Sequence, residues 1–552
     1  MSTILIKNGR IVDGTGGEIY NGHVYISEDR IDDVAPLDSD NGRDLLRKEA
    51  DTVIDAQGLA VAPGFIDCHS HFDFVLPLPD HHEFLFPMIE QGVTTVVTGN
   101  CGFSPAPVND ESRELTRISS EFVQEKPLSF EWSGMGEFID YLNSTGGLMF
   151  NNVQLAGHGP LHLMAVKDNV KQPDAGQMAQ MAAKAYEALD EGAFGLSLGL
   201  MYPPGIFSNK EDLTEIAKVA ADRGRILTVH TKALSKYSMA YPIIPVFGKP
   251  HNLKALGEIL DIGLKTGVKL QISHFIFVGK KSWPTVHKAV RMVENARDKG
   301  LDVIWDIYPH FCGNSYLSVF IAEWFLENLA ENLENTKAIK KLKFETKMAA
   351  RLLGFKLSDI QIMEANYPAG KKYNGMNLED IGEQEGIDPL DALLKIVKES
   401  DGKALQLTHG YSGDDENEWV LEKLMKNDLC LFETDTLLKA GGFPNPASYG
   451  AFPRILGRFV REKKTLSLSD AINKMTGKSA RWVGIKDRGE IKPDNFADIT
   501  VFNPDTIADN TTLTDTAKRP TGIEYVFLNG ELVVKNEKYI KNKKPGIALK
   551  YE

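Results

Sequence analysis

The sequence predicts an α/β protein: a (β/α)8 barrel of the TIM-barrel type, with a small β-sandwich domain formed from both termini and a helical insertion near the barrel mouth. Three observations predict this architecture. The middle of the chain alternates apolar runs with amphipathic helices, both ends carry short strands with tight turns, and one long helical segment interrupts the alternation.

The two ends of the chain predict one small β domain. Near the start, Asn8-Gly9 is a hairpin turn signal between two strand-like runs. Near the end, residues 497–502 form a predicted strand and a second hairpin is predicted about Asn529-Gly530. We therefore expect the termini to come together in one sheet domain, with the middle of the chain inserted between its halves.

The middle of the chain predicts eight βα units. Apolar runs of strand length alternate with amphipathic helices, such as those expected at residues 174–191 and 252–266. The eight runs cover residues 60–68, 94–98, 152–156, 193–198, 226–229, 269–273, 302–308 and 430–433. Strands and helices in this alternation predict a barrel, although an extra strand-like run at residues 404–408 leaves the count ambiguous.

One segment is too long for a loop and too helical for a linker. Residues 315–400 include a predicted helix over residues 322–353, so we expect an inserted subdomain beside the barrel mouth. The predicted domain limits are residues 1–62 with 480–552 for the β domain and residues 63–479 for the barrel.

Composition places the chain among ordinary globular proteins. Its 552 residues are 42% hydrophobic and 25% charged, and the net charge of −14 comes from acidic residues spread along the chain, which argues against a nucleic-acid partner. Four cysteines form no disulfide framework in a chain this long. The start lacks the apolar core of a signal peptide, and no apolar run has the length of a membrane segment. We expect a cytoplasmic protein without a membrane segment. The sequence leaves open whether the protein forms a homo-oligomer.

Two histidines, His69 and His71, follow the first apolar run of the middle segment. Side chains two apart in an extended strand share one face, so both rings are expected to point the same way. Neutral imidazole is the commonest protein ligand for zinc and similar ions. The pair therefore predicts half of a metal site, although an isolated pair would also fit a solvated edge strand.

Metal-binding residue types follow four further predicted strands. The loops after the strands of a barrel converge on one mouth, so residues far apart in sequence can meet there. The candidates are His69 and His71 after strand one, Cys101 after strand two, His230 after strand five, His274 after strand six and Asp435 after strand eight. Six good ligands at the ends of five strands favour a metal site over chance placement.

Each candidate also has a purely structural alternative. Free cysteine is usually a small buried hydrophobe, but the glycines flanking the Cys101 turn imply a sharp bend that exposes it, and a thiolate is a strong zinc ligand. Either His230 or His274, taken alone, would more often be a core residue. Burying an unpaired carboxylate is costly, so Asp435 either meets a cation or activates a proton.

These residues, in this order, resemble the amidohydrolase superfamily, and within it the N-acyl-D-amino-acid deacylases, or D-aminoacylases. The resemblance covers nearly the entire chain, and the Gly-Asn-Cys-Gly element around Cys101 is specific to this branch, whereas His-x-His marks only the superfamily. It is carried by residues 62–71, 98–107, 271–274, 451–458 and 489–498.

The resemblance implies one tightly held zinc ion and a second, weaker metal position. The implied ligands are Cys101, His230 and His274 for the tight zinc, and His69, His71 and Asp435 for the weaker position. Many superfamily members use a carboxylated lysine at the end of strand four. Residues 195–201 contain no lysine, and Cys101 is similar to the family's replacement for it.

One departure from the family concerns the substrate. Related deacylases carry an arginine that grips the substrate's α-carboxylate, in an element that ends in Ala447 here. Lys232 could substitute for it as a point charge. The family's Tyr-Pro-Tyr element is Tyr308-Pro309-His310 here, which makes Tyr308 and His310 candidate substrate contacts. A free N-acyl-amino acid is therefore only one candidate substrate.

The activity that the resemblance implies is zinc-dependent hydrolysis of a linear amide bond. The substrate would be an N-acyl-amino acid, D-type by resemblance, or a related small N-acyl compound. The metal would lower the pKa of a bound water towards ~7 to produce hydroxide, and would stabilise the developing oxyanion. Asp435 would act first as general base and then as general acid towards the leaving nitrogen.

Two alternatives remain open from the residues alone. The same ligands fit a cyclic amidase of hydantoinase or dihydroorotase type, or an aminohydrolase that removes ammonia from a ring. A non-catalytic barrel scaffold is the other alternative. Such a scaffold should show gaps among the ligands, and all six are present.

Overall fold

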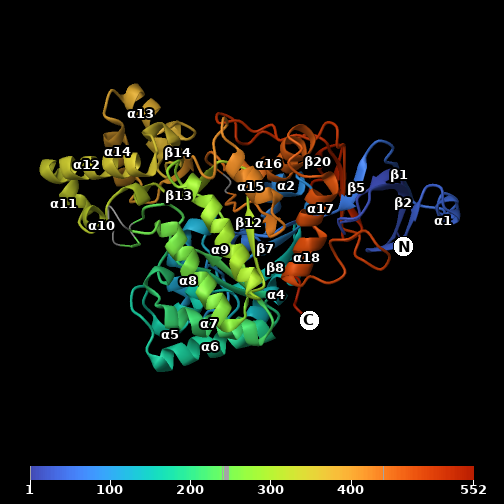
Figure 1. The fold of residues 1–552 in the computed structure, drawn as a ribbon, viewed down its shortest axis with the longest axis horizontal. Helices are drawn as coiled ribbons and strands as arrows, with labels where there is room; N and C mark the ends of the chain where they lie inside the picture. Colours follow the sequence, from blue (N-terminus) through green and yellow to red (C-terminus); the bar gives the residue numbers. More distant parts are fainter. Residues whose placement is uncertain (1, 239, 242–247, 439–440) are drawn as a thin grey trace.

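The computed structural model describes residues 2–238, 240–241, 248–438 and 441–552. Along the longest axis of the molecule, the inserted helical segment lies at one end and the first strands of the chain lie at the other (Figure 1). The barrel occupies the space between them.

The barrel sheet has eight parallel strands, in the order β16-β12-β11-β10-β9-β8-β7-β6. Backbone hydrogen bonds from Cys68 to Phe432 (N to O, 3.4 Å) and from Asp435 to His69 (3.0 Å) join the two edge strands and close the ring. The predicted barrel is confirmed. Its strands are β6(Phe65–Asp67), β7(Val93–Thr98), β8(Asn151–Gly157), β9(Gly195–Gly199), β10(Ile226–His230), β11(Lys269–Ile272), β12(Val303–Ile307) and β16(Cys430–Phe432).

Helices cover the outside of the barrel, so its strands are buried on both faces, as their near-continuous apolar runs require. The α-helices are α2(His82–Ile89), α3(Arg113–Ser119), α4(Met135–Ser144), α5(His158–Val166), α6(Ala175–Asp190), α7(Lys210–Asp222), α8(His251–Thr266), α9(Val286–Asp298), α15(Trp419–Lys426), α16(Ala447–Arg454), α17(Leu468–Met475) and α18(Gly477–Val483), with a π-helical turn at Ile455–Glu462. Short 3-10 turns cover Phe72–Phe74, Glu121–Val123, Gly205–Phe207 and Trp283–Thr285.

Local sequence explains where these helices begin and end. At the start of α6, the Asp174 side chain accepts from the Gln177 backbone, and the Gln177 side chain accepts from the Asp174 backbone, both at 2.9 Å. Helix α8 ends at Gly267, whose φ of 71° suits glycine. These caps satisfy backbone groups that would otherwise be left without partners.

Strands from both termini join in one nine-stranded sheet, because β17 pairs antiparallel with β5. The strands are β1(Thr3–Ile11), β2(Tyr20–Ser27), β3(Arg30–Pro36), β4(Thr52–Asp55), β5(Ala60–Pro63), β17(Ile499–Phe502), β18(Ile523–Leu528), β19(Glu531–Lys535) and β20(Lys538–Tyr539), with helix α1(Asp40–Leu45) beside them. The predicted hairpin about Asn529-Gly530 is confirmed by the pairing of β18 with β19.

Two local predictions at this end were wrong. Asn8-Gly9 is not a hairpin turn: Asn8 has a φ of 62° at an irregularity within β1, which continues to Ile11. The predicted strand at residues 60–68 splits at Gly64, so that β5 joins the terminal sheet and β6 joins the barrel. A side chain at Gly64 would collide with Thr94, which explains the glycine at the split.

The inserted segment has its own sheet and core. Its sheet holds β13(Cys312–Tyr316), β15(Leu405–His409) and β14(Ile360–Glu364), so the ambiguous run at 404–408 belongs here and leaves eight strands to the barrel. The helix predicted over residues 322–353 is instead three helices, because the chain turns at Asn328 and Asn335. The helices are α10(Glu323–Leu326), α11(Leu329–Glu334), α12(Thr336–Leu353), α13(Leu378–Glu385) and α14(Pro389–Glu399), with 3-10 turns at Leu317–Phe320, Leu357–Asp359 and Pro368–Tyr373.

Across the described ranges of the chain, no helix combines the length and the apolar character needed to cross a membrane. The predicted domain limits are not tested by these observations and stay predictions.

Candidate metal centre

All six predicted ligands meet at the carboxyl end of the barrel strands. Five of them are buried, whereas the Asp435 side chain is 23% exposed and faces the opening. His69 and His71 follow β6, Cys101 follows β7, His230 ends β10, His274 follows β11 and Asp435 follows β16. Residues 366 positions apart in the sequence, His69 and Asp435, are thereby brought together.

The sulfur of Cys101 lies at the centre of three imidazole rings. It is 3.3 Å from His69 Nε2, 3.4 Å from His274 Nε2 and 3.5 Å from His230 Nδ1. Tetrahedral zinc with Zn–S near 2.3 Å and Zn–N near 2.0–2.1 Å separates sulfur from nitrogen by about 3.5 Å. The spacing of the donors therefore fits zinc.

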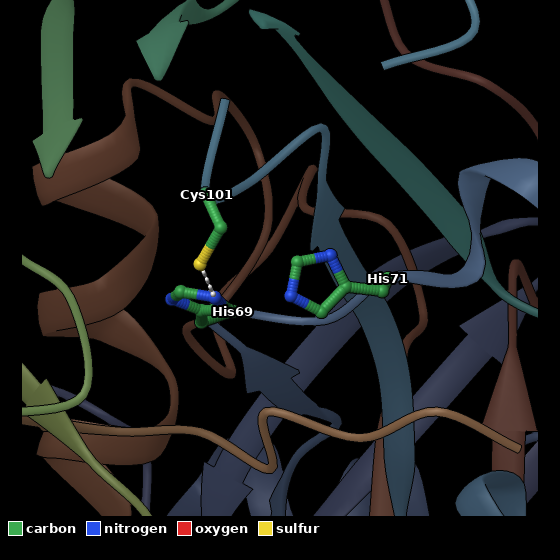
Figure 2. A group of neighbouring side chains, drawn as sticks. All are labelled: His69, His71 and Cys101. Atoms are coloured by element: carbon green, nitrogen blue, oxygen red, sulfur yellow. Dashed lines mark hydrogen bonds between the residues drawn. The ribbon is translucent and has the colours of Figure 1, made fainter. Parts of the chain in front are cut away.

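The carboxylate of Asp435 links the two histidines of the His-x-His pair. Its Oδ1 lies 3.5 Å from Nε2 of His69 and 3.5 Å from Nε2 of His71. Figure 2 shows the His69 ring beside the Cys101 sulfur and the His71 ring on the same side of the loop. Both rings share one face, as the spacing predicts, although they lie beyond the end of β6.

Positive φ angles mark three of these residues. Cys101, His274 and Asp435 have φ values of 52°, 31° and 47°. Such angles are uncommon away from glycine and cluster at functional sites. The flanking Gly99 and Gly102 have φ values of 80° and 76°, so the sharp turn predicted around Cys101 is present.

Burial favours the neutral form of three of the imidazoles and the protonated form of the thiol. Desolvation holds the pKa of His69 and of His230 well below the usual value, and also lowers the pKa of His274. Desolvation, followed by the Asp435 and Glu433 charges, raises the pKa of the Cys101 thiol well above its usual value. A thiolate here needs a cation beside it, which a zinc ion provides.

Three further carboxyl groups lie beneath the candidate ligands, and sequence reasoning missed them. Desolvation raises the pKa of Asp67 to about 7, against hydrogen bonds from Thr434, and raises the pKa of Asp306 to about 7. Burial and the neighbouring Asp306 raise the pKa of Glu433 well above its usual value. Acidic residues within buried apolar strands were the signal that could have identified them.

Three tyrosines lie near the candidate ligands. Tyr308 was a predicted substrate contact, and its hydroxyl is buried without a hydrogen-bond partner among the described residues. Tyr202 and Tyr411 were missed. The Tyr202 hydroxyl lies 3.4 Å from His230 Nδ1. Desolvation and the Asp435 charge raise the pKa of Tyr308, and both contribute to the raised pKa of Tyr411 from the inserted segment.

The two predicted charged substrate contacts have different surroundings. His310 Nε2 lies 3.0 Å from Asp509 Oδ2, which also lies 3.6 Å from Arg454, so that nitrogen is already engaged. Lys232 is half-buried, and in the described part of the chain it has no ion pair or hydrogen bond. Of the two, Lys232 keeps its polar group free.

A small recess opens beside the Cys101 turn. Its walls come from the loop after β7, from α3 and from the start of α5, and they include Phe103, Ser120, His158 and Tyr202. Burial lowers the pKa of His158 to about 3, so this ring is neutral. The recess is lined in part by Cys101 itself and by both polar and aromatic side chains.

Two sequence models described as "Amidohydrolase family" match the chain, one over residues 60–335 and the other over residues 364–534. Among characterised relatives, N-acyl-D-glutamate deacylase of Alcaligenes xylosoxydans xylosoxydans is 30% identical over 528 residues, covering 96% of this chain and 92% of the relative. D-aminoacylase of the same organism is 28% identical over 540 residues, covering 96% and 93%.

Solved structures agree with the sequence comparisons. N-acyl-D-glutamate deacylase from Bordetella bronchiseptica, complexed with zinc and a phosphonate inhibitor that mimics the tetrahedral intermediate, matches with a TM-score of 0.79 at 28% identity over 99% of both chains. A D-aminoacylase crystal structure matches with a TM-score of 0.77 at 25% identity, also over 99% of both chains. L-hydantoinase from Arthrobacter aurescens, at 15% identity and a TM-score of 0.56, shares the fold.

Proposed function

The chain belongs to the amidohydrolase family, and from that premise we propose that it is a zinc-dependent hydrolase of linear amide bonds that deacylates an N-acyl-amino acid or a related N-acyl compound. The observation that carries this proposal is the Cys101 sulfur within 3.5 Å of imidazole nitrogens from three separate strand ends. Relatives that span nearly the whole chain are N-acyl-D-amino-acid deacylases, which supports the D-type substrate.

We assign two metal positions with different affinities. The tight zinc position comprises Cys101, His230 and His274, and the weaker one comprises His69, His71 and Asp435. The distances between donors support both groups, and His69 Nε2 is as close to the sulfur as the nitrogens of the tight position. One solved D-aminoacylase is described with a binuclear metal centre, with one-metal activation and second-metal attenuation.

A bound zinc ion supplies Lewis acidity, which acidifies water and polarises the scissile carbonyl. Asp435 is the group we propose to move protons: it takes one from the attacking water and delivers it to the leaving nitrogen. Its position supports this role, because its carboxylate is partly exposed at the mouth and touches both His69 and His71.

We propose that the substrate is bound by polar side chains that have an unpaired polar atom in the described structure. The Tyr308 hydroxyl, buried and unpaired in the described structure, is positioned to donate a hydrogen bond to a substrate oxygen. Lys232 would meet a substrate carboxylate, and His310 would contact substrate through the nitrogen that Asp509 does not occupy. Ala447 is fully buried at the start of α16, so the family arginine has no equivalent at that position.

The test is a substrate panel for the purified, zinc-loaded enzyme. It contains N-acyl-D-amino acids, their L-enantiomers, the matching α-amides and cyclic substrates of hydantoin type. We expect turnover of linear N-acyl-D compounds. If Lys232 alone binds the substrate carboxylate, the free acids should be hydrolysed only slightly faster than the matching α-amides. Turnover confined to cyclic substrates, or no hydrolysis of any linear N-acyl compound, would contradict the proposal.

The cytoplasm is the compartment we propose, because all four cysteines are buried and unpaired, as expected where thiols stay reduced. A homo-oligomer stays a prediction, which sedimentation of the purified protein tests.

A further inference from the structure

The His69 ring lies between two groups of side chains. Its Nε2 faces Cys101 Sγ at 3.3 Å and Asp435 Oδ1 at 3.5 Å. On its other side, Nδ1 lies 3.7 Å from Asp306 Oδ1 and 3.7 Å from Glu433 Oε2. The ring therefore separates the candidate metal position from a buried acidic pair.

The two acids behind the ring differ in how they are held. The Asp306 carboxylate accepts from the Gln271 side chain and from the His274 backbone N–H, so its position is set by β11 and the turn after it. Glu433 is fully buried against the Asp306 carboxyl group, and neither of its oxygens has a hydrogen bond of ordinary geometry among the described residues. Burying a carboxyl group that lacks a hydrogen bond costs free energy, so we expect it to have a polar partner.

The His69 ring offers an unsatisfied donor 3.7 Å from Glu433 Oε2. Nδ1 of His69 is itself buried without a partner in the described structure, and it lies beside the Glu433 carboxyl. A neutral imidazole carries one proton, so a proton held on Nδ1 leaves the lone pair on Nε2. That arrangement directs Nε2 towards the Cys101 sulfur and Asp435, where a metal ligand is needed.

The other candidate ligands lack such an arrangement. Nδ1 of His71 and Nδ1 of His274 are also buried without a partner, but no described carboxylate forms an ion pair with either nitrogen. An orienting contact at one ligand alone should change one metal position more than the other. This difference makes the role of Glu433 measurable.

We propose that Glu433, together with Asp306, is a positioning residue that holds the His69 ring through Nδ1 and thereby sets the affinity of the weaker metal position. This inference rests on the proposed metal centre, and it goes beyond it by assigning a function to two fully buried acids behind a candidate ligand. Carboxylates behind a metal-binding histidine typically change metal affinity 10–100-fold.

The test is a cadmium titration of the metal-free protein. Cadmium bound to Cys101 gives a thiolate charge-transfer absorption, and total bound cadmium is measured separately by elemental analysis. Glu433→Gln keeps the size of the side chain and removes its carboxyl group. In this variant we expect the dissociation constant of the cadmium ion that is not bound to Cys101 to rise about 10–100-fold. The dissociation constant of the Cys101-bound ion should change by less than about threefold.

Glu90→Gln is the matched control, because Glu90 is also buried, its Oε1 accepts from the Tyr539 backbone N–H at 2.9 Å, and it contacts none of the candidate ligands. Glu433→Asp is the second variant: it keeps the carboxyl group but withdraws it from Nδ1, and it should weaken binding of the same ion. Thermal unfolding of the metal-free forms verifies that each variant is folded.

The inference would be overturned by unchanged affinities in Glu433→Gln, by equal weakening of both ions, or by the same effect from Glu90→Gln. A third cadmium ion per chain would also overturn it, by indicating that the acids bind metal themselves. A wild-type protein with one ion at Cys101 and none beside it would remove this inference but leave the proposed function standing. Absence of any bound ion would remove both.

Discussion

Single residues set the chemistry that the site can perform. A thiol buried among three imidazoles stays protonated without a cation, because desolvation opposes its negative charge. The carboxylate that touches both His69 and His71 is the one ligand group with substantial exposure. Cys101 is therefore suited to hold metal, whereas Asp435 can reach water and substrate.

Replacement of Cys101 by alanine is expected to remove the tight zinc ion, because three nitrogens then lose the thiolate donor between them. The zinc content of the purified variant, measured by elemental analysis, should fall by one ion per chain. Cys68→Ala is the control: Cys68 is equally buried, but its sulfur contacts Ser479 Oγ at 3.1 Å and no candidate ligand. Unchanged stoichiometry in Cys101→Ala would show that Cys101 is not a ligand.

Replacement of Asp435 by asparagine is expected to keep the fold and the tight zinc ion but to lower kcat by about 10²–10⁴-fold, because asparagine cannot accept and return a proton. The measurement pairs turnover of the preferred N-acyl substrate with zinc content of the same sample. A variant with full zinc and full activity would remove Asp435 from the proton transfer. Loss of the tight zinc ion would instead assign Asp435 mainly to metal binding.

At the level of elements, the turn after β7 presents the sulfur to the barrel mouth. Gly99 and Gly102 adopt φ values that glycine tolerates, and side chains there would collide with the backbone of β8 and β9. Close approach of this turn to the neighbouring strands therefore requires glycine. The same crowding fixes the direction in which Cys101 points.

Gly99→Ala is expected to destabilise the protein more than a positive φ alone explains, because the added methyl group would collide with the Leu155 carbonyl oxygen. Gly58→Ala is the matched control, since Gly58 has a similar φ of +83° against +80° for Gly99, but open space around the added methyl group. We expect a loss of about 1–2 kcal/mol for Gly58→Ala and about 1–3 kcal/mol more for Gly99→Ala. Free energies of unfolding from urea titrations would provide the comparison, and equal losses would contradict it.

The inserted segment contributes to the site through the chain that follows β15. Strand β15 carries the chain to Tyr411, so an element outside the barrel supplies an aromatic side chain near Asp435. The sequence predicted the insertion and its place but not this contact. Its strand was indistinguishable from a barrel strand by apolar pattern alone, because both are short and buried.

On the scale of the whole molecule, the barrel is inserted in sequence between the two halves of the terminal sheet, which pair directly with each other through β5 and β17. The last residues also run along the barrel: Leu549 N donates to Asn152 O at 2.8 Å, and Asn152 N donates to Ile547 O at 2.8 Å. The site itself draws ligands from strands at both ends of the barrel sequence. A bound ion therefore cross-links distant parts of the chain.

Removal of metal by a chelator is expected to lower the thermal unfolding midpoint, and added zinc should restore it. A ligand that binds only the folded state stabilises it by about 4 kcal/mol at 1,000 times its dissociation constant. Differential scanning calorimetry of the chelated and zinc-restored protein measures the effect. Cys101→Ala should show little response to zinc, and an identical midpoint with and without metal in the wild type would contradict a cross-linking ion.

The sequence by itself determined the barrel, the six candidate ligands and their order, because apolar runs and strand-end positions are local properties of the chain. Prediction from the sequence failed where local signals compete. Asn8-Gly9 is a typical turn pair yet lies inside β1, and the helix predicted over residues 322–353 is broken at two asparagines. Only the tertiary structure decided that Glu433 and Asp306 lie behind His69, that Tyr411 reaches the mouth, and that His310 meets Asp509. Those contacts join segments far apart in the sequence, and their formation depends on how the strands close and where the insertion packs, which no local pattern encodes.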